Sequence, residues 1–145
     1  VKVVDEAHTH EHGLEVHLPF LQEVLGKFSL VPFVVGHASQ TEVAEVLELL
    51  WGGSETLIVI SSDLSHYLDY DHARKLDAVT CKAIEQMQPD QIDRVQACGR
   101  RSIQGLLKSA QKRQMSAVTL DLRNSGDTAG LKDRVVGYGA WVIGS

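Results

Sequence analysis

Cysteine is scarce in this chain of 145 residues, and long hydrophobic runs and clusters of basic charge are missing. Two cysteines, Cys81 and Cys98, are too few for a disulfide framework, which favours a reducing cytoplasm. No apolar run approaches the roughly 20 residues that span a bilayer, and no signal peptide is visible. Lysine and arginine are spread along the chain and the net charge is -5. We therefore expect no membrane and no nucleic-acid partner.

The composition is that of an ordinary globular domain, with 43% hydrophobic and 23% charged residues. Apolar residues that recur every three or four positions predict helices over residues 14–25 (or from Pro19), 41–51 and 71–87. A further helix is predicted after Cys98, ending at about residue 114. An apolar run at residues 28–35 suits an edge strand or a strand start because of Pro32, and a second run covers residues 56–60. Closing strands are expected at residues 117–122 and 134–143, with a turn-rich loop at 124–130 between them. The alternation predicts an α/β fold, a three-layer sandwich with a mainly parallel sheet. On the third helix we expect Ala73, Leu76, Val79, Ala83 and Ile84 to face inward.

The stretch 56–66 is central to the functional prediction. Residues 56–60 are apolar and rich in β-branched side chains, which predicts a central strand buried on both faces. Asp63 and His66 follow it, at the end of a strand where open α/β sheets bind ligands. Such a pair could move protons near neutral pH, with His66 and Asp63 in catalytic roles. Alternatively, Ser62 or Asp63 caps a local turn and His66 packs on the surface.

Cys98 lies at or just before the start of a predicted helix, beside Arg100 and Arg101. Positive charge and a helix N-terminus favour the thiolate that binds metals. A buried, inert cysteine is the alternative, and it is what we expect of Cys81.

Three histidines, His8, His10 and His12, alternate near the beginning of the chain. Such a tract binds metal in some proteins and is a solvated loop in others. If this region is helical, His12 and Glu15 share one face, which makes them candidate binding residues.

Four stretches in this order resemble the Memo family, whose bacterial members are also labelled AmmeMemoRadiSam system protein B. They are residues 11–20 (Glu-His-Gly-Leu-Glu-Val-His-Leu-Pro-Phe), 61–66 (Ser-Ser-Asp-Leu-Ser-His), 98–100 with Ile103, and 124–127 followed by 136–138. The resemblance implies a fold similar to class III extradiol dioxygenases, and a nonheme metal pocket of two histidines and one cysteine. Cys98 matches that cysteine as a metal ligand. Asp63 and His66 match pocket residues, and His66 resembles the acid/base histidine.

The family's two metal histidines belong to Pro-His-Ala-Gly-Tyr and Gly-Pro-Ser-His-His motifs, and neither motif occurs here. We therefore expect residues 1–145 to be the C-terminal portion of a Memo-like domain, in agreement with a first residue that is not methionine. Its partner would be a missing N-terminal segment or a second copy of itself.

Two functions follow from the resemblance. The first is a protein that uses iron or copper in redox or dioxygenase-like chemistry, completed by histidines missing from this chain, which alone would be inactive. The second is a non-catalytic module that binds a peptide, a partner or a small molecule in the same pocket. A serine hydrolase using Ser62 or Ser65 is disfavoured, because no G-x-S-x-G elbow occurs.

Overall fold

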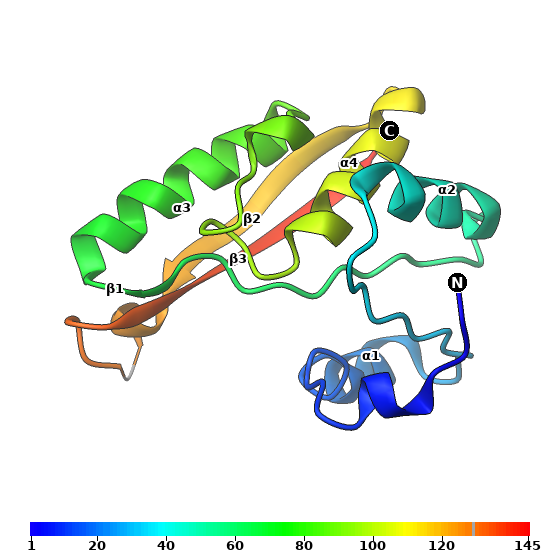
Figure 1. The fold of residues 1–145 in the computed structure, drawn as a ribbon, viewed down its shortest axis with the longest axis horizontal. Coiled ribbons are helices and arrows are strands. Elements are labelled where there is room, and N and C mark those ends of the chain that lie inside the picture. The colour runs from blue at the N-terminus through cyan, green and yellow to red at the C-terminus, as the bar shows by residue number, and fades with distance from the viewer. Residues whose placement is uncertain (129) are drawn as a thin grey trace. The chain divides into compact units, whose positions relative to one another are not determined.

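The computed structural model describes residues 1–128 and 130–145, which form two compact units (Figure 1). The first unit is Val1–His37 and the second is Ala38–Ser145. None of the described helices has the length and apolar character needed to cross a membrane.

The first unit contains a short 3-10 helix, η1 (Asp5–His8), and one α-helix, α1 (Leu18–Leu25). The helix begins next to Pro19, whose fixed φ suits a first turn, and ends at Gly26 with a φ of 68°. This confirms the later of the two predicted starts. Residues 28–35, predicted as a strand, form neither helix nor strand. That prediction is wrong because no described segment pairs with this run, and side chains such as Val31 remain exposed.

The second unit contains the other three α-helices: α2 (Gln40–Leu50), α3 (Tyr70–Glu85) and α4 (Arg100–Lys112). Their positions agree with the predicted ranges to within a few residues. Ser39 caps α2 in a reciprocal capping box with Glu42, and the Asp69 side chain accepts the His72 backbone N–H at the start of α3. A 3-10 turn, η2 (Pro89–Gln91), separates α3 from α4.

The sheet has three antiparallel strands in the order β1-β3-β2. They are β1 (His66–Leu68), β2 (Ser116–Asn124) and β3 (Val135–Gly144), with η3 (Ser125–Asp127) after β2. Both predicted closing strands form, as β2 and β3, but the prediction of a mainly parallel sheet was wrong, because the described strands pair antiparallel. A short turn region joins β2 to β3, and short connections produce antiparallel neighbours. The predicted loop 124–130 includes Ala129, which lies outside the described residues.

Residues 56–60, predicted as a buried central strand, are neither helical nor paired with any described strand. Leu57 is 62% exposed and Val59 is 45% exposed, while Ile58 and Ile60 are half-buried. The prediction fails because a strand forms only with a neighbour, and the described part of this chain provides none for this run.

The core of the second unit lies between one face of the sheet and the helices α3 and α4. Its buried residues come from both helices and from the loops before β1 and α4: Leu64, Ala83, Ile84, Ile92, Ala97 and Leu107. Trp141 and Ile143 on β3 pack against this cluster. On α3 the buried positions include Asp77 and Thr80, whereas Val79, expected to face inward, is 57% exposed.

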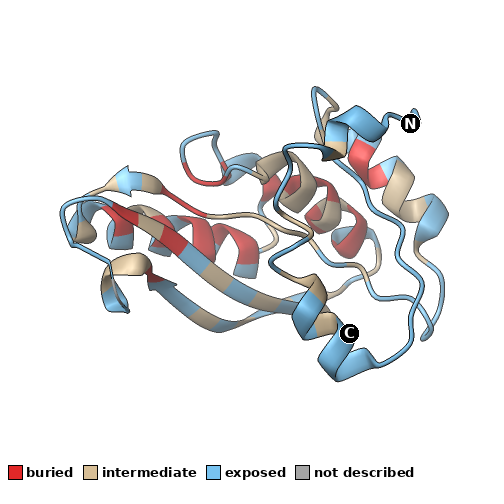
Figure 2. Cartoon of the chain, turned by 90° about the horizontal axis from the view of Figure 1, so that it is seen from below, coloured by how far each residue is buried: buried red, intermediate tan, exposed pale blue. Residues whose placement is uncertain are grey.

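The opposite face of the sheet is open. In Figure 2 the ribbons of β2 and β3 lie in front of α3 and α4, and exposed positions alternate along both strands. Val118 and Val142 are paired across the strands and are both more than half exposed. Within the described residues of the second unit, no helix covers this face.

Helices α2 and α4 pack closely at Gly105, which predicts an unusual response to alanine. A Cβ at Gly105 would overlap the side chain of Val43 on α2. Replacing glycine with alanine normally stabilises a helix by about 1 kcal/mol. We expect Gly105→Ala to lower the free energy of unfolding by about 1–3 kcal/mol instead, because the helices must separate. Urea unfolding measures the change.

The matched control is the double variant Val43→Ala/Gly105→Ala. Removing the Val43 methyl groups relieves the shortest contact, that with Cγ1, although the Cβ that remains at position 43 is still 2.6 Å from the new Cβ. The double variant should therefore recover part of the lost free energy and be more stable than the sum of the two single changes predicts. If the effects of the two substitutions on the free energy of unfolding simply add, the steric explanation is contradicted.

Candidate metal centre

Two loops of the second unit meet where β1 and α4 begin. The backbone N–H of Cys98 donates to the carbonyl oxygen of Asp63 at 3.3 Å. In return, the backbone N–H of Asp63 donates to the Cys98 sulfur at 3.3 Å. These reciprocal hydrogen bonds connect segments that are 35 residues apart in the sequence and hold the thiol beside Asp63.

Gly99 makes this approach possible. A Cβ at Gly99 would lie 2.8 Å from the carbonyl oxygen of Ser61 and 2.8 Å from Cβ of Ser62. The Gly99 backbone N–H also donates to Ser62 Oγ at 2.9 Å. Only glycine therefore fits between the two loops without displacing them.

Asp63, His66 and Cys98 converge as the sequence predicted. Each residue offers one potential donor atom: a carboxylate oxygen, an imidazole nitrogen and a sulfur, respectively. All three atoms lie within 4.8 Å of one another. Asp63 Oδ2 is 3.5 Å from His66 Nε2, and their side chains are 48% and 34% exposed. The group thus faces solvent on one side, which leaves access for a ligand. Its catalytic and metal-binding roles stay predictions.

Ser62 contributes to the structure of this site. Its hydroxyl donates to the carbonyl oxygen of Asp63 at 2.7 Å and accepts the Gly99 N–H. Its described partners are therefore backbone groups and the Cys98 sulfur, 3.7 Å away, rather than His66. This arrangement gives no support to a serine nucleophile activated by His66.

His12 and Glu15 belong to the first unit. His12 Nδ1 lies 3.5 Å from a Glu15 carboxylate oxygen, and both side chains are well exposed. This proximity was expected for a helix, whereas residues 13–17 form a turn that brings the two side chains together. They precede α1, so the pair lies in the turn before the helix. Their role in ligand binding stays a prediction.

Tyr67 and Arg134 extend the surface beside His66. Tyr67 has a φ of 60°, a left-handed backbone conformation that is unusual for an aromatic residue. Its ring lies edge-on to His66 with 5.8 Å between centroids, and the Arg134 guanidinium lies 4.9 Å from its centre. Neither residue belongs to the motifs from which the site was predicted.

Asp77 was also missed. Its side chain is buried on α3, and Oδ1 accepts the Ser65 backbone N–H at 3.0 Å. Burial raises the pKa of Asp77, and the hydrogen bond from Ser65 opposes that rise. The signal was present in the spacing, because Ala73, Asp77, Thr80 and Ile84 follow one helical face.

The family model described as Memo-like protein matches residues 1–142. The chain belongs to the Memo-like family. Among its relatives is a MEMO1 family protein of Aeropyrum pernix, 35% identical, with 94% of this chain and 53% of the relative covered. A MEMO1 family protein of Methanosarcina acetivorans is also 35% identical, with 94% and 56% covered. One of Aquifex aeolicus is 34% identical, with 91% and 54% covered.

Family membership confirms the resemblance that the sequence motifs carried. The chain spans about half the length of the curated relatives it matches. Activities, substrates and partners of a whole Memo-like protein are therefore proposals for this chain.

The exposure of the two cysteines predicts their reactivity. Both are free thiols; Cys98 is exposed and Cys81 is buried at 9% exposure. We expect iodoacetamide to alkylate Cys98 in the folded protein and Cys81 only after unfolding in urea, because alkylation needs an accessible sulfur. Mass spectrometry of the intact chain and of its peptides identifies the labelled site. Equal labelling of both cysteines under native conditions would contradict the described packing.

Proposed function

We propose that this chain contributes Asp63, His66 and Cys98 to a nonheme metal pocket for iron or copper. The observation that supports it most directly is the convergence of the three donor atoms within 4.8 Å. Imidazole and thiolate suit both metals, and a carboxylate adds a harder oxygen donor. The donor set therefore fits the metals that the family resemblance implies.

The proposed activity is redox or dioxygenase-like. A bound iron or copper ion would supply one-electron or oxygen chemistry, which protein side chains alone do not provide. Cys98 would hold the metal through its sulfur. Where ligands from outside this chain complete the coordination of the metal, His66 would instead hold or transfer a proton at Nε2, with Asp63 as its partner at 3.5 Å. Two free thiols agree with a reducing cytoplasmic location, which is part of this proposal.

The second candidate is a module that binds a peptide or partner in the same pocket without chemistry. The exposed aromatic ring of Tyr67 beside His66 supports it, because such side chains are frequent in binding surfaces. Metal binding separates the two functions, since only the first requires it.

Metal titration tests the proposed centre. We expect the chain to bind Co²⁺, a spectroscopic substitute for iron, with a sulfur-to-metal charge-transfer band. Cys98→Ser should abolish the band, and Cys98→Ser or His66→Ala should weaken binding at least about tenfold, because each removes one of few donors. Absorbance and calorimetry, repeated anaerobically with Fe²⁺ and with Cu⁺, measure these changes.

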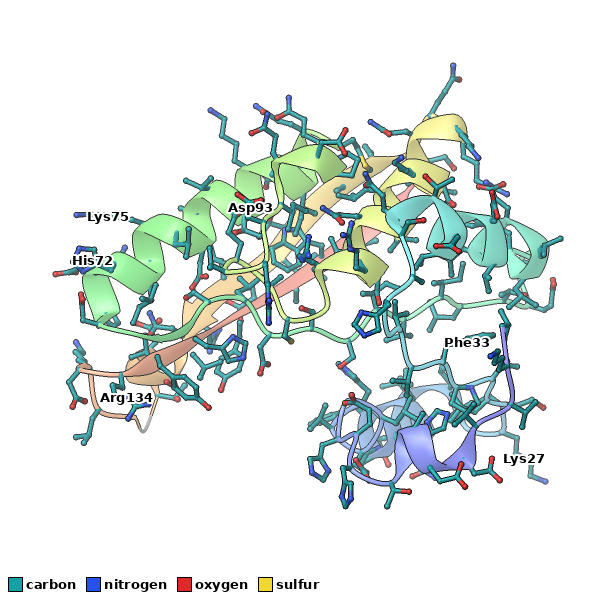
Figure 3. All side chains as sticks on the ribbon, in the orientation of Figure 1. Lys27, Phe33, His72, Lys75, Asp93 and Arg134 are labelled. Atoms are coloured by element: carbon teal, nitrogen blue, oxygen red, sulfur yellow. The ribbon has the colours of Figure 1, made fainter. Side chains whose placement is uncertain are left out.

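His72→Ala is the matched control. His72 and Asp69 have the same three-residue spacing as His66 and Asp63, and they lie at the exposed start of α3 (Figure 3). No third potential ligand joins them among the described residues. The control should bind metal as the unaltered chain does. Tight binding that Cys98→Ser leaves unchanged would contradict the proposed site.

We also propose that a further polypeptide segment completes this pocket. That segment corresponds to the part of the MEMO1 family relatives that residues 1–145 do not cover. Residues 57–60 run directly into the site and have a strand-like sequence. Within the described part of the chain, their backbone makes no hydrogen bond. Leu57 and Val59 are exposed on this segment. An added strand would satisfy the backbone and cover these side chains.

Reconstitution tests this partner. We expect the matching polypeptide from a relative, added as a separate chain, to bind this chain and to raise its metal affinity by supplying imidazoles. Leu57→Asp/Val59→Asp should prevent binding, because a carboxylate cannot be buried against an apolar strand without a large cost. Sedimentation velocity measures the complex.

Val79→Asp is the control for that variant. Val79 is comparably exposed, at 57%, but lies on α3. It should leave the complex intact. A complex that tolerates both aspartates at 57 and 59, or self-association of this chain in place of the added partner, would contradict the proposal.

A further inference from the structure

Asp77 is a buried carboxyl group directly behind the candidate metal centre. It is 3% exposed, although it belongs to a residue type that is rarely buried without a partner. The proposed donors do not include it. Its position therefore needs a separate explanation.

The backbone of Ser65 is held from two directions. Its N–H donates to Asp77 Oδ1 at 3.0 Å, and its carbonyl oxygen accepts the Gly137 N–H at 2.8 Å. The preceding residue, Leu64, donates its N–H to the Gly137 carbonyl oxygen at 2.9 Å. Ser65 lies between the two potential donors Asp63 and His66, so these bonds fix the middle of the segment that carries both.

Gly137 leaves room for this arrangement. A Cβ at that position would overlap the Asp77 carboxylate. Helix α3 and strand β3 thus approach each other at Asp77 and Gly137, with Ser65 bound to both. The side chain of His66 emerges from this anchored backbone at 34% exposure.

We propose that Asp77 is a positioning residue: through the Ser65 backbone, it fixes the Asp63–His66 segment in the geometry that binds metal. This inference deepens the proposed function and rests on it where metal binding is concerned. A preorganised donor pair loses less entropy when a metal binds, and residues that orient ligands typically change metal affinity by about 10–100-fold when replaced.

The test compares three variants. Asp77→Ala removes the acceptor for the Ser65 N–H. Asp77→Asn keeps an oxygen acceptor of the same size, so it should rescue the contact. Thr80→Ala alters another fully buried polar residue, one turn further along α3, whose described hydrogen bonds go to Leu76 and Gln96 and not to the site.

The first readout needs no metal. We expect Asp77→Ala to accelerate hydrogen exchange of the Ser65 amide and to shift the ring signals of His66 in NMR spectra. Asp77→Asn and Thr80→Ala should leave the His66 signals close to those of the unaltered chain, and also the exchange rate of the Ser65 amide relative to that of other core amides. This comparison removes the uniform acceleration that lower global stability causes in Thr80→Ala. Circular dichroism establishes that each variant is folded.

The second readout is Co²⁺ affinity, measured by absorbance. We expect Asp77→Ala to raise the Kd at least about tenfold, with Asp77→Asn and Thr80→Ala near the original value. A folded Asp77→Ala protein with unchanged Ser65 exchange and unchanged His66 signals would overturn the inference, as would an equal effect of Thr80→Ala.

The two readouts separate the two claims. If the unaltered chain binds no Co²⁺ but Asp77→Ala alters Ser65 and His66, the proposed metal function fails and the positioning role of Asp77 stands. If metal binds and Asp77→Ala changes neither readout, the proposed function stands and the positioning role is wrong.

Discussion

The candidate metal centre depends on the close approach of two backbone segments at Gly99. Because no side chain separates them there, Cys98 and Asp63 exchange hydrogen bonds through backbone groups and the sulfur. The thiol is consequently fixed by main-chain geometry, although it is exposed to solvent. A larger residue at position 99 would separate the thiol from the other two donors without touching any of them.

Local sequence patterns were sufficient to predict most helices and strands of the fold. The helices and the closing strand pair β2–β3 follow from side-chain spacing and from caps such as Ser39, which depend on nearby residues. Residues 56–60 show the limit of this reasoning. A run of β-branched residues indicates suitability for a buried strand, but only another segment can provide the hydrogen bonds. The described residues contain no such neighbour, so the predicted parallel sheet did not form.

The site was predictable only in part. The motif resemblance identified Asp63, His66 and Cys98, and the structure brings their donor atoms together. Asp77 was missed because its partner is the backbone N–H of Ser65, which leaves no mark in the sequence. In the structure, Asp77 lies four residues after Ala73 and seven before Ile84, on the buried face of α3 that these residues share. A carboxylate on an apolar helix face indicates that a hydrogen-bond donor lies opposite it, and here Asp77 is 3% exposed whereas the apolar Val79 is 57% exposed.

In the proposed pocket, the number of metal ligands from outside this chain determines whether Asp63 binds the metal or exchanges a proton with His66. If no outside ligand arrives, the three donors of this chain are the minimum for a catalytic metal site, so Asp63 must bind the ion itself. If a partner supplies two imidazoles, as the family resemblance implies, they and Cys98 already provide three ligands. Asp63 and His66 then remain free to exchange a proton across their 3.5 Å separation. In the proposed pocket, completion by outside ligands would thus convert a ligand pair into an acid/base pair without moving either residue.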